Sequence, residues 1–259
     1  MGDGEAGHVD PTTLFREADL KSRMHETTYV GRDLEAMSFA PNYHRWILQN
    51  FSPHIGTRIA EVGAGIGNFS KLLLEKKPEI LILLEPSPNL FEELKAKVSA
   101  DDGILAYNGT LPDYSEKLGA AKLDTIAYVN VLEHIENDRE ELRLAFTLLQ
   151  PGGKILIFVP AMQFLYGTFD HAVGHIRRYS ESEIFEKLMD AGFKPKYYRY
   201  FDSVGVVPWF IAFKILRLHK LSNGMAGNYD KIVVPILRRI EDKFHPLFGK
   251  NIIAVGEKE

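Results

Sequence analysis

The stretch Arg58-Ile-Ala-Glu-Val-Gly-Ala-Gly-Ile-Gly67 constrains the fold of this chain more than any other. An apolar run ends in alternate glycines, Gly63, Gly65 and Gly67, and an amphipathic segment follows. This order predicts a buried parallel strand, a tight turn and then a helix. Glycines at the turn let a ligand approach the main chain closely, and the helix N-terminus adds unpaired N–H groups. We therefore expect an α/β sheet with a nucleotide-type ligand at this turn.

The spacing of the glycines bears on which nucleotide is bound. The dinucleotide fingerprint G-x-G-x-x-G requires a glycine or alanine at position 68 or 70, depending on the glycine from which it is counted. Asn68 and Ser70 stand at these positions, so both registers fail. An acid, Glu61, instead lies two residues before Gly63. The pattern argues against an NAD-type cofactor.

The pattern Glu61-x-Gly63-x-Gly65-x-Gly67 resembles motif I of class I S-adenosylmethionine (SAM)-dependent methyltransferases. In that family the glycine loop lies under the amino-acid part of SAM, and the acid fixes the methionyl ammonium. The resemblance implies SAM as the cofactor. It also implies a Rossmann-like sheet of seven strands, the seventh antiparallel, with helices on both faces.

The next apolar run, residues 80–85, predicts a second strand that ends in Glu85. An acid at this tip can accept hydrogen bonds from both ribose hydroxyls, and the position resembles its counterpart in the methyltransferases. Ser87 and Pro88 then predict a helix start. Residues 103–110 read as a third strand and loop, where the family usually carries an Asp that contacts the adenine. This chain has Thr110 there, with Asp113 three residues on.

Residues 124–130 predict a fourth strand, and Asn130-Val-Leu-Glu-His134 follows at its carboxyl end, where open α/β sheets bind ligands. The sequence Leu148-Leu-Gln-Pro-Gly-Gly153 precedes a fifth strand at residues 154–160. Both motifs are characteristic of the same methyltransferase superfamily. Asn137 with Glu140 and Ser180 with Glu183 predict capping boxes at two helix starts. The cofactor-binding residues that follow from the pattern and the resemblance are Tyr43, Glu61, Gly63, Ala64, Gly65, Gly67, Asn68, Glu85, Pro86, Thr110, Asn130, Val131 and Leu132.

Tyr43 belongs to a predicted helix at residues 41–51, just before the first strand. In methyltransferases of this type the segment before that strand often covers the SAM pocket. Aromatic residues at helical spacing are also typical of a packed core. We assign Trp46 to the core and leave both roles open for Tyr43.

The segment after the fifth strand, residues 165–180, gathers histidines, arginines, tyrosines and an Asp in a place where loops usually carry function. It resembles the Leu-Tyr-Gly…Asp…Gly-His-x-Arg-Arg-Tyr signature of bacterial methyltransferases (the type 11/12-like group) associated with glycosyltransferases and natural-product pathways. That match extends from about Asn42 to Glu259. The candidate catalytic residues are His134, His175, Arg178 and Tyr179.

Two interpretations of this acceptor side stay open. In one, His134 or His175 is a general base, because histidine titrates near neutral pH. In the other, Arg177 and Arg178 with His175 hold an acceptor that is already anionic. We predict no metal. Asn130 stands where the similar methyltransferases of ubiquinone biosynthesis carry an additional Glu, and Gly174 interrupts the i, i+4 pair His171 and His175.

The predicted domain organisation is a flexible N-terminal arm or lid at residues 1–40, with a short helix around residues 14–24, followed by a methyltransferase domain at 41–259. A sixth strand is predicted at 196–203 and a seventh at 250–256. The intervening residues 204–248 predict a helical cap insertion, with helices at 204–218 and 230–244. We expect it to cover the acceptor pocket. A dimer interface and a lipid-facing surface are the alternatives.

Composition narrows the remaining choices. A net charge of −4 over 259 residues disfavours general nucleic-acid binding, and the absence of cysteine excludes disulfides and thiolate chemistry. We expect a cytoplasmic monomer or homodimer without a signal peptide or transmembrane segment. The predicted function is methyl transfer from SAM, foremost to oxygen, on a small-molecule or saccharide/lipid-linked acceptor. An NAD-dependent oxidoreductase and a catalytically silent SAM-binding subunit are the alternatives.

Overall fold

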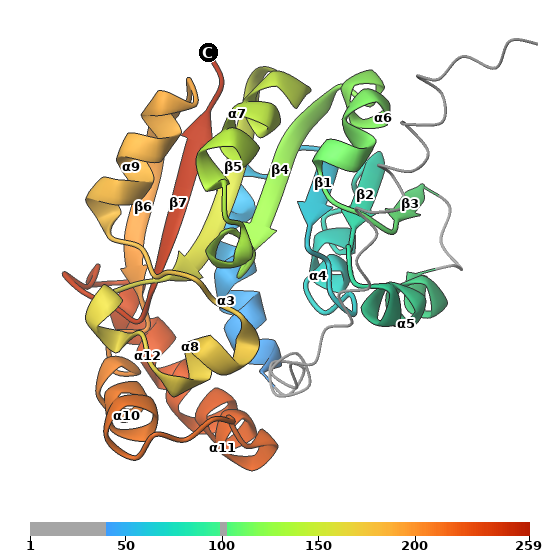
Figure 1. Ribbon diagram of the computed structural model, residues 1–259. Coiled ribbons are helices and arrows are strands. Elements are labelled where there is room, and N and C mark those ends of the chain that lie inside the picture. The colour runs from blue at the N-terminus through green and yellow to red at the C-terminus, as the bar shows by residue number, and fades with distance from the viewer. Residues whose placement is uncertain (1–39, 99–102) are drawn as a thin grey trace, which may run out of the picture.

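The computed structural model describes residues 40–98 and 103–259. These residues build one sheet of seven strands in the order β3-β2-β1-β4-β5-β7-β6 (Figure 1). Strand β7 runs antiparallel to both of its neighbours, whereas the other pairs are parallel. The predicted fold class is therefore confirmed. The strands are β1 (Arg58–Val62), β2 (Ile80–Leu84), β3 (Ile104–Tyr107), β4 (Leu123–Val129), β5 (Leu149–Pro160), β6 (Lys194–Phe201) and β7 (Asn251–Glu257).

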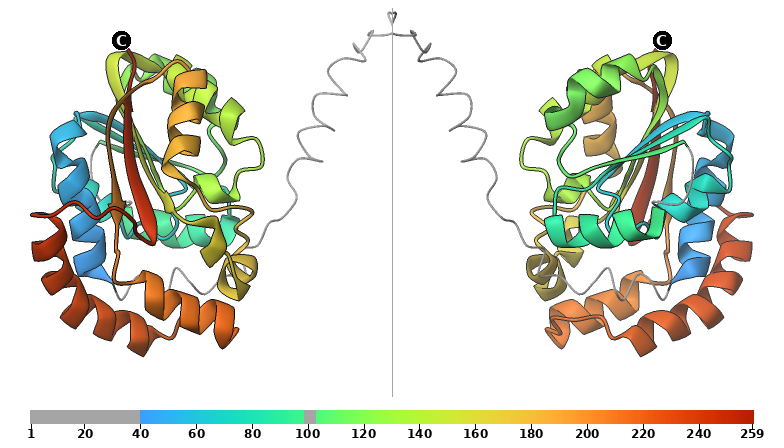
Figure 2. Two further views of the ribbon diagram at one scale, coloured as in Figure 1. Left: turned by 90° about the vertical axis from the view of Figure 1, so that its left-hand side faces the viewer. Right: turned by 90° about the vertical axis from the view of Figure 1, so that its right-hand side faces the viewer.

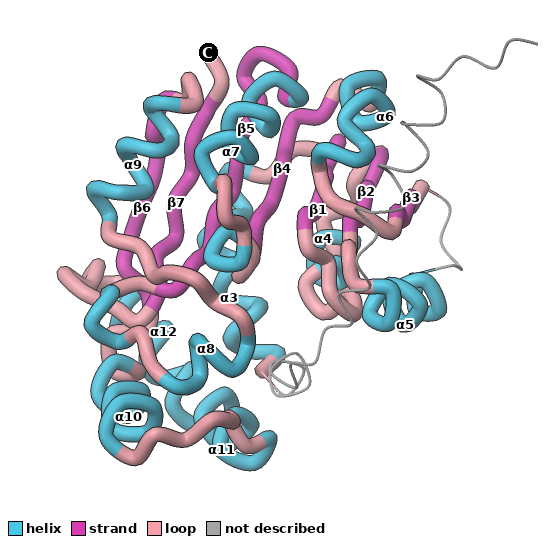
Figure 3. The backbone as a smooth tube through the Cα atoms, in the orientation of Figure 1, coloured by secondary structure: helices cyan, strands magenta, loops and turns pink. Residues whose placement is uncertain are grey.

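Helices cover both faces of the sheet because the strands are apolar on both sides (Figure 3). Along β2, Ile82 and Leu84 pack into one core while Leu81 and Leu83 pack into the other. The first core is closed by α6 (Ser115–Ala120), α7 (Asp138–Leu148) and α9 (Glu181–Asp190). The second is closed by α3 (Pro41–Phe51), α4 (Ser70–Leu74) and α5 (Pro88–Val98). Trp46 on α3 is fully buried in that second core, as predicted.

Residues 204–248 connect β6 to β7 and are called the cap below. They comprise α10 (Val206–Phe210), a π-helical turn (Ile211–Ile215), α11 (Asn223–Asn228), a second π-helical turn (Tyr229–Val233) and α12 (Val234–Glu241). The cap forms a layer beneath the end of the sheet (Figure 2). The prediction of two continuous helices, at 204–218 and 230–244, misses α11 and both π-helical turns.

Buried carboxylates fasten the cap to the sheet and to α3. Asp230 accepts hydrogen bonds from the backbone N–H groups of Asn42 and Tyr43, at 3.1 and 2.8 Å. Glu241 accepts from the backbone N–H groups of Asp202 and Ser203. Since both carboxylates are buried, these bonds hold the cap in one position over the carboxyl ends of the strands.

Several local expectations differ from the structure. The side chain of Asn137 forms no capping bond, whereas Ser180 accepts from the N–H of Glu183 as predicted. Strand β5 starts at Leu149, earlier than predicted, because Leu149 already pairs with Leu123. Helices α6 and α8 (Thr168–Val173) were not predicted. The helix expected around residues 14–24 lies outside the described residues. No helix in the described ranges is long and apolar enough to cross a membrane.

Candidate active site

A cavity of about 1060 Å³ opens at the carboxyl ends of the parallel strands, between the sheet and the cap. Its walls include most of the residues that the sequence predicts for the site. The predicted cofactor residues that line it are Tyr43, Glu61, Gly63, Ala64, Gly65, Asn68, Glu85, Pro86, Asn130 and Val131, and the predicted catalytic residues are His134, His175 and Arg178. The volume is at the upper end of the about 300–1,000 Å³ of ordinary ligand pockets, which leaves room for a cofactor and an acceptor together.

The glycine loop after β1 takes the backbone conformation for which glycine is suited. Gly63 and Gly65 have φ values of +68° and +56°. A Cβ atom at Gly63 would lie 2.5 Å from a methyl group of Val131, which comes from the loop after β4. Only a residue without a side chain lets these two loops meet at the edge of the cavity.

Glu61 lies beneath this loop with only 2% of its surface exposed. Among the described residues, its hydrogen-bond donor is the hydroxyl of Ser70, at 2.5 Å. Burial raises the pKa of Glu61 to about 8, although the bond from Ser70 opposes the shift. A buried carboxylate with so little compensation is suited to receive a positively charged group, such as the ammonium of a bound amino acid.

Glu85 joins the ends of β1 and β2. Its carboxylate accepts hydrogen bonds from the backbone N–H groups of Gly65 and Ser87, both at 2.8 Å. Burial raises the pKa of this carboxyl, and the two N–H donors partly offset that rise. The residue therefore fixes the glycine loop and also lines the cavity, where the ribose was expected.

Four of the predicted site residues do not line the cavity. Gly67 faces α5, where an added Cβ would lie 2.9 Å from Leu94. The backbone N–H and the hydroxyl of Thr110 both donate to Asp113. Leu132 is fully buried in the core. The hydroxyl of Tyr179 lies 2.9 Å from both the carbonyl oxygen of Leu132 and the carboxylate of Asp138, so it takes part in packing below the cavity floor.

Tyr43 lies both in the core and at the wall of the cavity. Its ring packs against Trp46, Phe158 and Phe201 in the core and also lines the cavity. Its hydroxyl donates to Asp202 or to Asn251, at 3.2 and 3.1 Å. These bonds join α3 to the strand ends that carry the cap.

On the acceptor side, Asp170 organises His175 and Arg178. Its carboxylate accepts from Nδ1 of His175 at 2.9 Å and from two nitrogens of the Arg178 guanidinium at 2.9 and 3.1 Å. Burial alone would raise the pKa of Asp170, but the bonds from His175 and Arg178 outweigh it and hold the pKa below its usual range. In the neutral form of His175, Nδ1 carries the proton that it donates to Asp170, and Nε2 carries the lone pair.

His134 presents a second imidazole to the cavity, and its ring centre lies 4.7 Å from that of His175. Its Nδ1 lies 3.2 Å from the carbonyl oxygen of Gly174. Since a carbonyl oxygen can only accept, Nδ1 carries the proton, and Nε2 of the neutral ring carries none. Burial, and then the neighbouring His175, lower the pKa of His134 to about 4. This histidine is therefore neutral at pH 7 and a weak base.

Glu133, His134 and His175 form the group among the described residues that could hold a metal ion. Their candidate ligand atoms lie within 4.8 Å of one another, and Oε1 of Glu133 is 3.7 Å from Nε2 of His175. Ligands of a tetrahedral zinc ion lie only about 3.4 Å apart. Glu133 is fully buried, has no hydrogen-bond partner among the described residues and does not line the cavity. Burial raises its pKa to about 7. The expectation that the site works without a metal stays a prediction.

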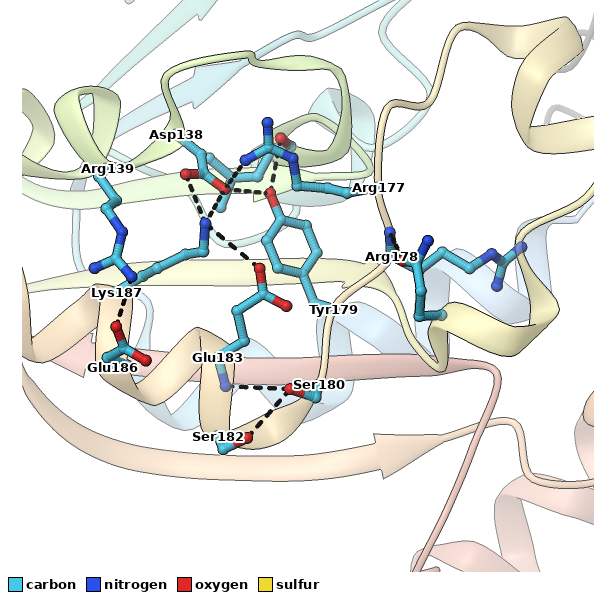
Figure 4. Close-up of polar contacts among 12 residues, drawn as sticks. Asp138, Arg139, Arg177, Arg178, Tyr179, Ser180, Ser182, Glu183, Glu186 and Lys187 are labelled. Atoms are coloured by element: carbon cyan, nitrogen blue, oxygen red, sulfur yellow. Dashed lines mark hydrogen bonds and ion pairs between the residues drawn. The ribbon is translucent and has the colours of Figure 1, made fainter.

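Arg177, Arg178 and Tyr179 point to opposite sides of their segment (Figure 4). Arg177 and Tyr179 turn toward Asp138 at the start of α7, and Lys187 of α9 reaches the same carboxylate at 2.7 Å. Arg178 turns the other way, toward Asp170. Arg177 is therefore engaged with Asp138 and is not among the residues that line the cavity.

The cap contributes residues to the cavity that the sequence did not single out. The indole of Trp209 lies 5.3 Å from the guanidinium carbon of Arg178 and 4.7 Å from Nζ of Lys250. Its buried N–H has no hydrogen-bond partner in the part of the chain that the structure describes. Nζ of Lys250 pairs with Asp202 at 2.9 Å. In the sequence, Trp209 belongs to an apolar helix. It is distinguished from a core residue only by neighbours that are distant in the sequence, Arg178 and Lys250.

The fold and the cavity at its strand ends define a class I SAM-dependent methyltransferase. A family model described as a methyltransferase domain matches residues 12–196, and the chain belongs to that family. SAM is its cofactor. The alternative of an NAD-dependent oxidoreductase is set aside by this match.

Similar proteins share the fold but differ widely in sequence. A SAM-dependent methyltransferase from Archaeoglobus fulgidus superposes with a TM-score of 0.57 at 18% identity, covering 96% of this chain and 100% of that one. The N-methyltransferase NodS from Bradyrhizobium japonicum, solved with S-adenosylhomocysteine (SAH), gives 0.54 at 15% identity, covering 85% and 87%. A tRNA U34 carboxymethyltransferase from Syntrophotalea carbinolica is 30% identical over 116 residues. The match covers 43% of this chain and only 34% of the length of that relative.

Proposed function

We propose that this methyltransferase transfers the methyl group of SAM to an oxygen of a small-molecule or saccharide/lipid-linked acceptor, with His175 as the general base. The observation that carries the proposal is the 2.9 Å bond between Asp170 and Nδ1 of His175 at the cavity wall. A buried carboxylate that orients an imidazole leaves its other nitrogen ready to take a proton.

SAM carries the activation for the reaction, and the protein supplies alignment and the base. The acceptor hydroxyl gives its proton to Nε2 of His175 while its oxygen attacks the methyl carbon. When bound, SAM would supply the methyl group and leave as SAH, a neutral thioether. The imidazolium then lies between two carboxylates, Asp170 at 2.9 Å and Glu133 at 3.7 Å, which stabilise its charge.

His134 is the weaker candidate for the base because its pKa of about 4 leaves it little affinity for a proton. We propose that it helps to position the acceptor. The interpretation in which arginines hold an anionic acceptor loses support, since Arg178 is neutralised by a bidentate bond to Asp170 and Arg177 is bound to Asp138.

We propose an acceptor other than a nucleic acid. The chain has a net charge of −4, and the cap side of the cavity is apolar, with Trp209, Phe213 and Val234 among its residues. The tRNA-modifying relative matches over less than half of this chain.

The test uses SAM with a deuterated methyl group and a panel of hydroxyl, carboxylate and amine acceptors, analysed by mass spectrometry. We expect an O-methyl product whose rate of formation falls about 10²–10⁴-fold in His175→Ala. His54→Ala, outside the cavity in the turn that precedes β1, is the matched control and should keep full activity. Methylation at nitrogen alone, or full activity of His175→Ala, contradicts the proposal. SAH binding without turnover of any acceptor favours the silent subunit.

A further inference from the structure

The outer face of the cap is unusually apolar for an exposed surface. Most of the large apolar side chains that are exposed among the described residues lie in the cap. They form two stripes at four-residue spacing: Val207, Ile211 and Ile215 on one helical segment, and Ile232, Ile236 and Ile240 on the other. Each of these six side chains is at least 43% exposed. Contiguous apolar surface of this kind marks a site of interaction.

Both stripes point away from the sheet. The opposite sides of the same segments carry Phe213, which lines the cavity, and Val234 and Leu237, which pack into the core beneath the sheet. The cap is the outermost layer at that end of the molecule (Figure 2). Among the residues that the structure describes, none covers this outer face.

The cap carries more positive than negative side chains. It contains seven lysines and arginines and three acids. Asp230 and Glu241 are buried, and Asp242 accepts bonds from Trp46 and Arg199. None of the seven cations forms an ion pair with a residue that the structure describes. The exposed charge of the cap is thus cationic in a chain whose net charge is −4.

We propose that the outer face of the cap docks on the surface of a lipid bilayer with anionic headgroups. Apolar stripes with flanking lysines and arginines are what an interfacial helix presents to such a surface. No described helix can span a membrane, so the cap lies on the surface. A symmetric dimer through the same face is disfavoured, because a two-fold contact would place the unpaired cations of both copies against one another.

The docking surface narrows the acceptor class. The cap helices line the cavity with their inner sides and, when docked, meet the bilayer with their outer sides, so the cavity lies next to the layer that contacts the lipid. Of the acceptors under consideration, a lipid-linked one fits this geometry. This last step rests on the proposed function, whereas docking does not.

The test is co-sedimentation of the full chain with vesicles, without SAM or acceptor, so that its outcome is independent of turnover. Vesicles of phosphatidylcholine alone are compared with vesicles that also contain phosphatidylglycerol. We expect binding to the anionic vesicles that weakens with salt. The triple variant Lys231→Gln/Arg239→Gln/Lys243→Gln removes three cations. Its affinity for anionic vesicles should fall about a hundredfold, because each cation contributes about fivefold.

Two further comparisons make the result specific. Ile236→Ser/Ile240→Ser should also lose binding, whereas Met189→Ser on α9 and Lys71→Gln/Lys95→Gln on α4 and α5 should retain it. An SAH-induced rise in melting temperature shows that each variant is folded. Absence of binding to anionic vesicles overturns the proposal, as does equal binding by the triple variant. A concentration-dependent dimer that Ile236→Ser/Ile240→Ser abolishes assigns the face to a second copy instead.

Discussion

The carboxylate of Asp170 lies 2.9 Å from Nδ1 of His175, and this pair joins α8 to the wall of the cofactor cavity. Asp170 on α8 also holds Arg178, so one buried acid fixes both the imidazole and the guanidinium. The pair gives His175 a fixed tautomer, which is what a base needs in order to act on a positioned hydroxyl.

Replacing Asp170 should impair catalysis through His175. Asp170→Asn keeps the size of the side chain but removes the charge that stabilises the imidazolium, so we expect kcat to fall about 10²–10⁴-fold with a smaller change in KM. SAH affinity, measured by calorimetry, should stay within a few-fold of the wild type. A variant with wild-type kcat would exclude this role for the pair.

Cofactor binding should depend on pH through Glu61. Its pKa of about 8 in the empty site means that it is mostly protonated at pH 7. The ammonium of SAH favours the ionised form, so binding releases a proton and the affinity rises with pH up to that pKa, by as much as about tenfold per unit. Calorimetry between pH 6 and 8 measures this slope. Glu61→Gln should bind SAH more weakly, and its affinity should no longer rise with pH. If the affinity of Glu61→Gln rises with pH as steeply as that of the wild type, Glu61 is not the titrating group.

Gly63 in the glycine loop has a matched control in Gly152 of β5. Gly63 and Gly152 both have positive φ values, +68° and +79°, so an alanine is strained at either position. An added Cβ meets Val131 at Gly63 but no atom within 4 Å at Gly152. We expect both variants to melt at lower temperature, and only Gly63→Ala to lose SAH binding. Normal SAH affinity in Gly63→Ala would show that the loop does not approach the cofactor.

Asp138 should matter for stability rather than for chemistry. It is buried and bonded to Lys187, Arg177 and Tyr179 (Figure 4). Asp138→Ala leaves the buried Lys187 ammonium without this partner, which should cost about 3–5 kcal/mol of the free energy of unfolding. Denaturant titration measures the loss.

Tyr179→Phe removes only a hydroxyl from the same cluster. It should cost about 1 kcal/mol and leave kcat unchanged, because this hydroxyl lies outside the cavity. A large fall in kcat with unaltered stability would show that Tyr179 has a catalytic role, as the sequence analysis predicted.

Methyl transfer should survive chelation. Dialysis against EDTA should leave the activity unchanged if His175 takes the proton itself. Loss of activity that zinc or magnesium restores would assign Glu133, His134 and His175 to a metal site instead.

The sequence is most informative where a short pattern determines the local backbone. The spacing of Glu61, Gly63 and Gly65 specifies a strand, a turn and a close approach, and all three residues line the cavity. The density of polar residues at 165–180 likewise predicts a second wall of the cavity, which His175 and Arg178 line. Such features depend on neighbours in the chain, so they can be read without a structure.

The sequence is least informative where distant elements decide the role of a side chain. Arg177 and Tyr179 leave the cavity side because Asp138, some forty positions earlier, lies behind them. Trp209 enters the cavity because the cap folds back under α8. The π-helical turns of the cap were not predicted from the sequence, since each packs against an element far away in the chain: Phe213 of the first turn contacts α8, and Asp230 of the second binds α3.

The most direct test of the account is a crystal structure of the chain with SAH. We predict the amino-acid part of SAH on the glycine loop beside Glu61, its ribose at Glu85, and its sulfur directed toward His175 across a gap that one acceptor oxygen can fill. A complex in which the sulfur faces away from His175, or in which SAH lies outside this cavity, would contradict the account.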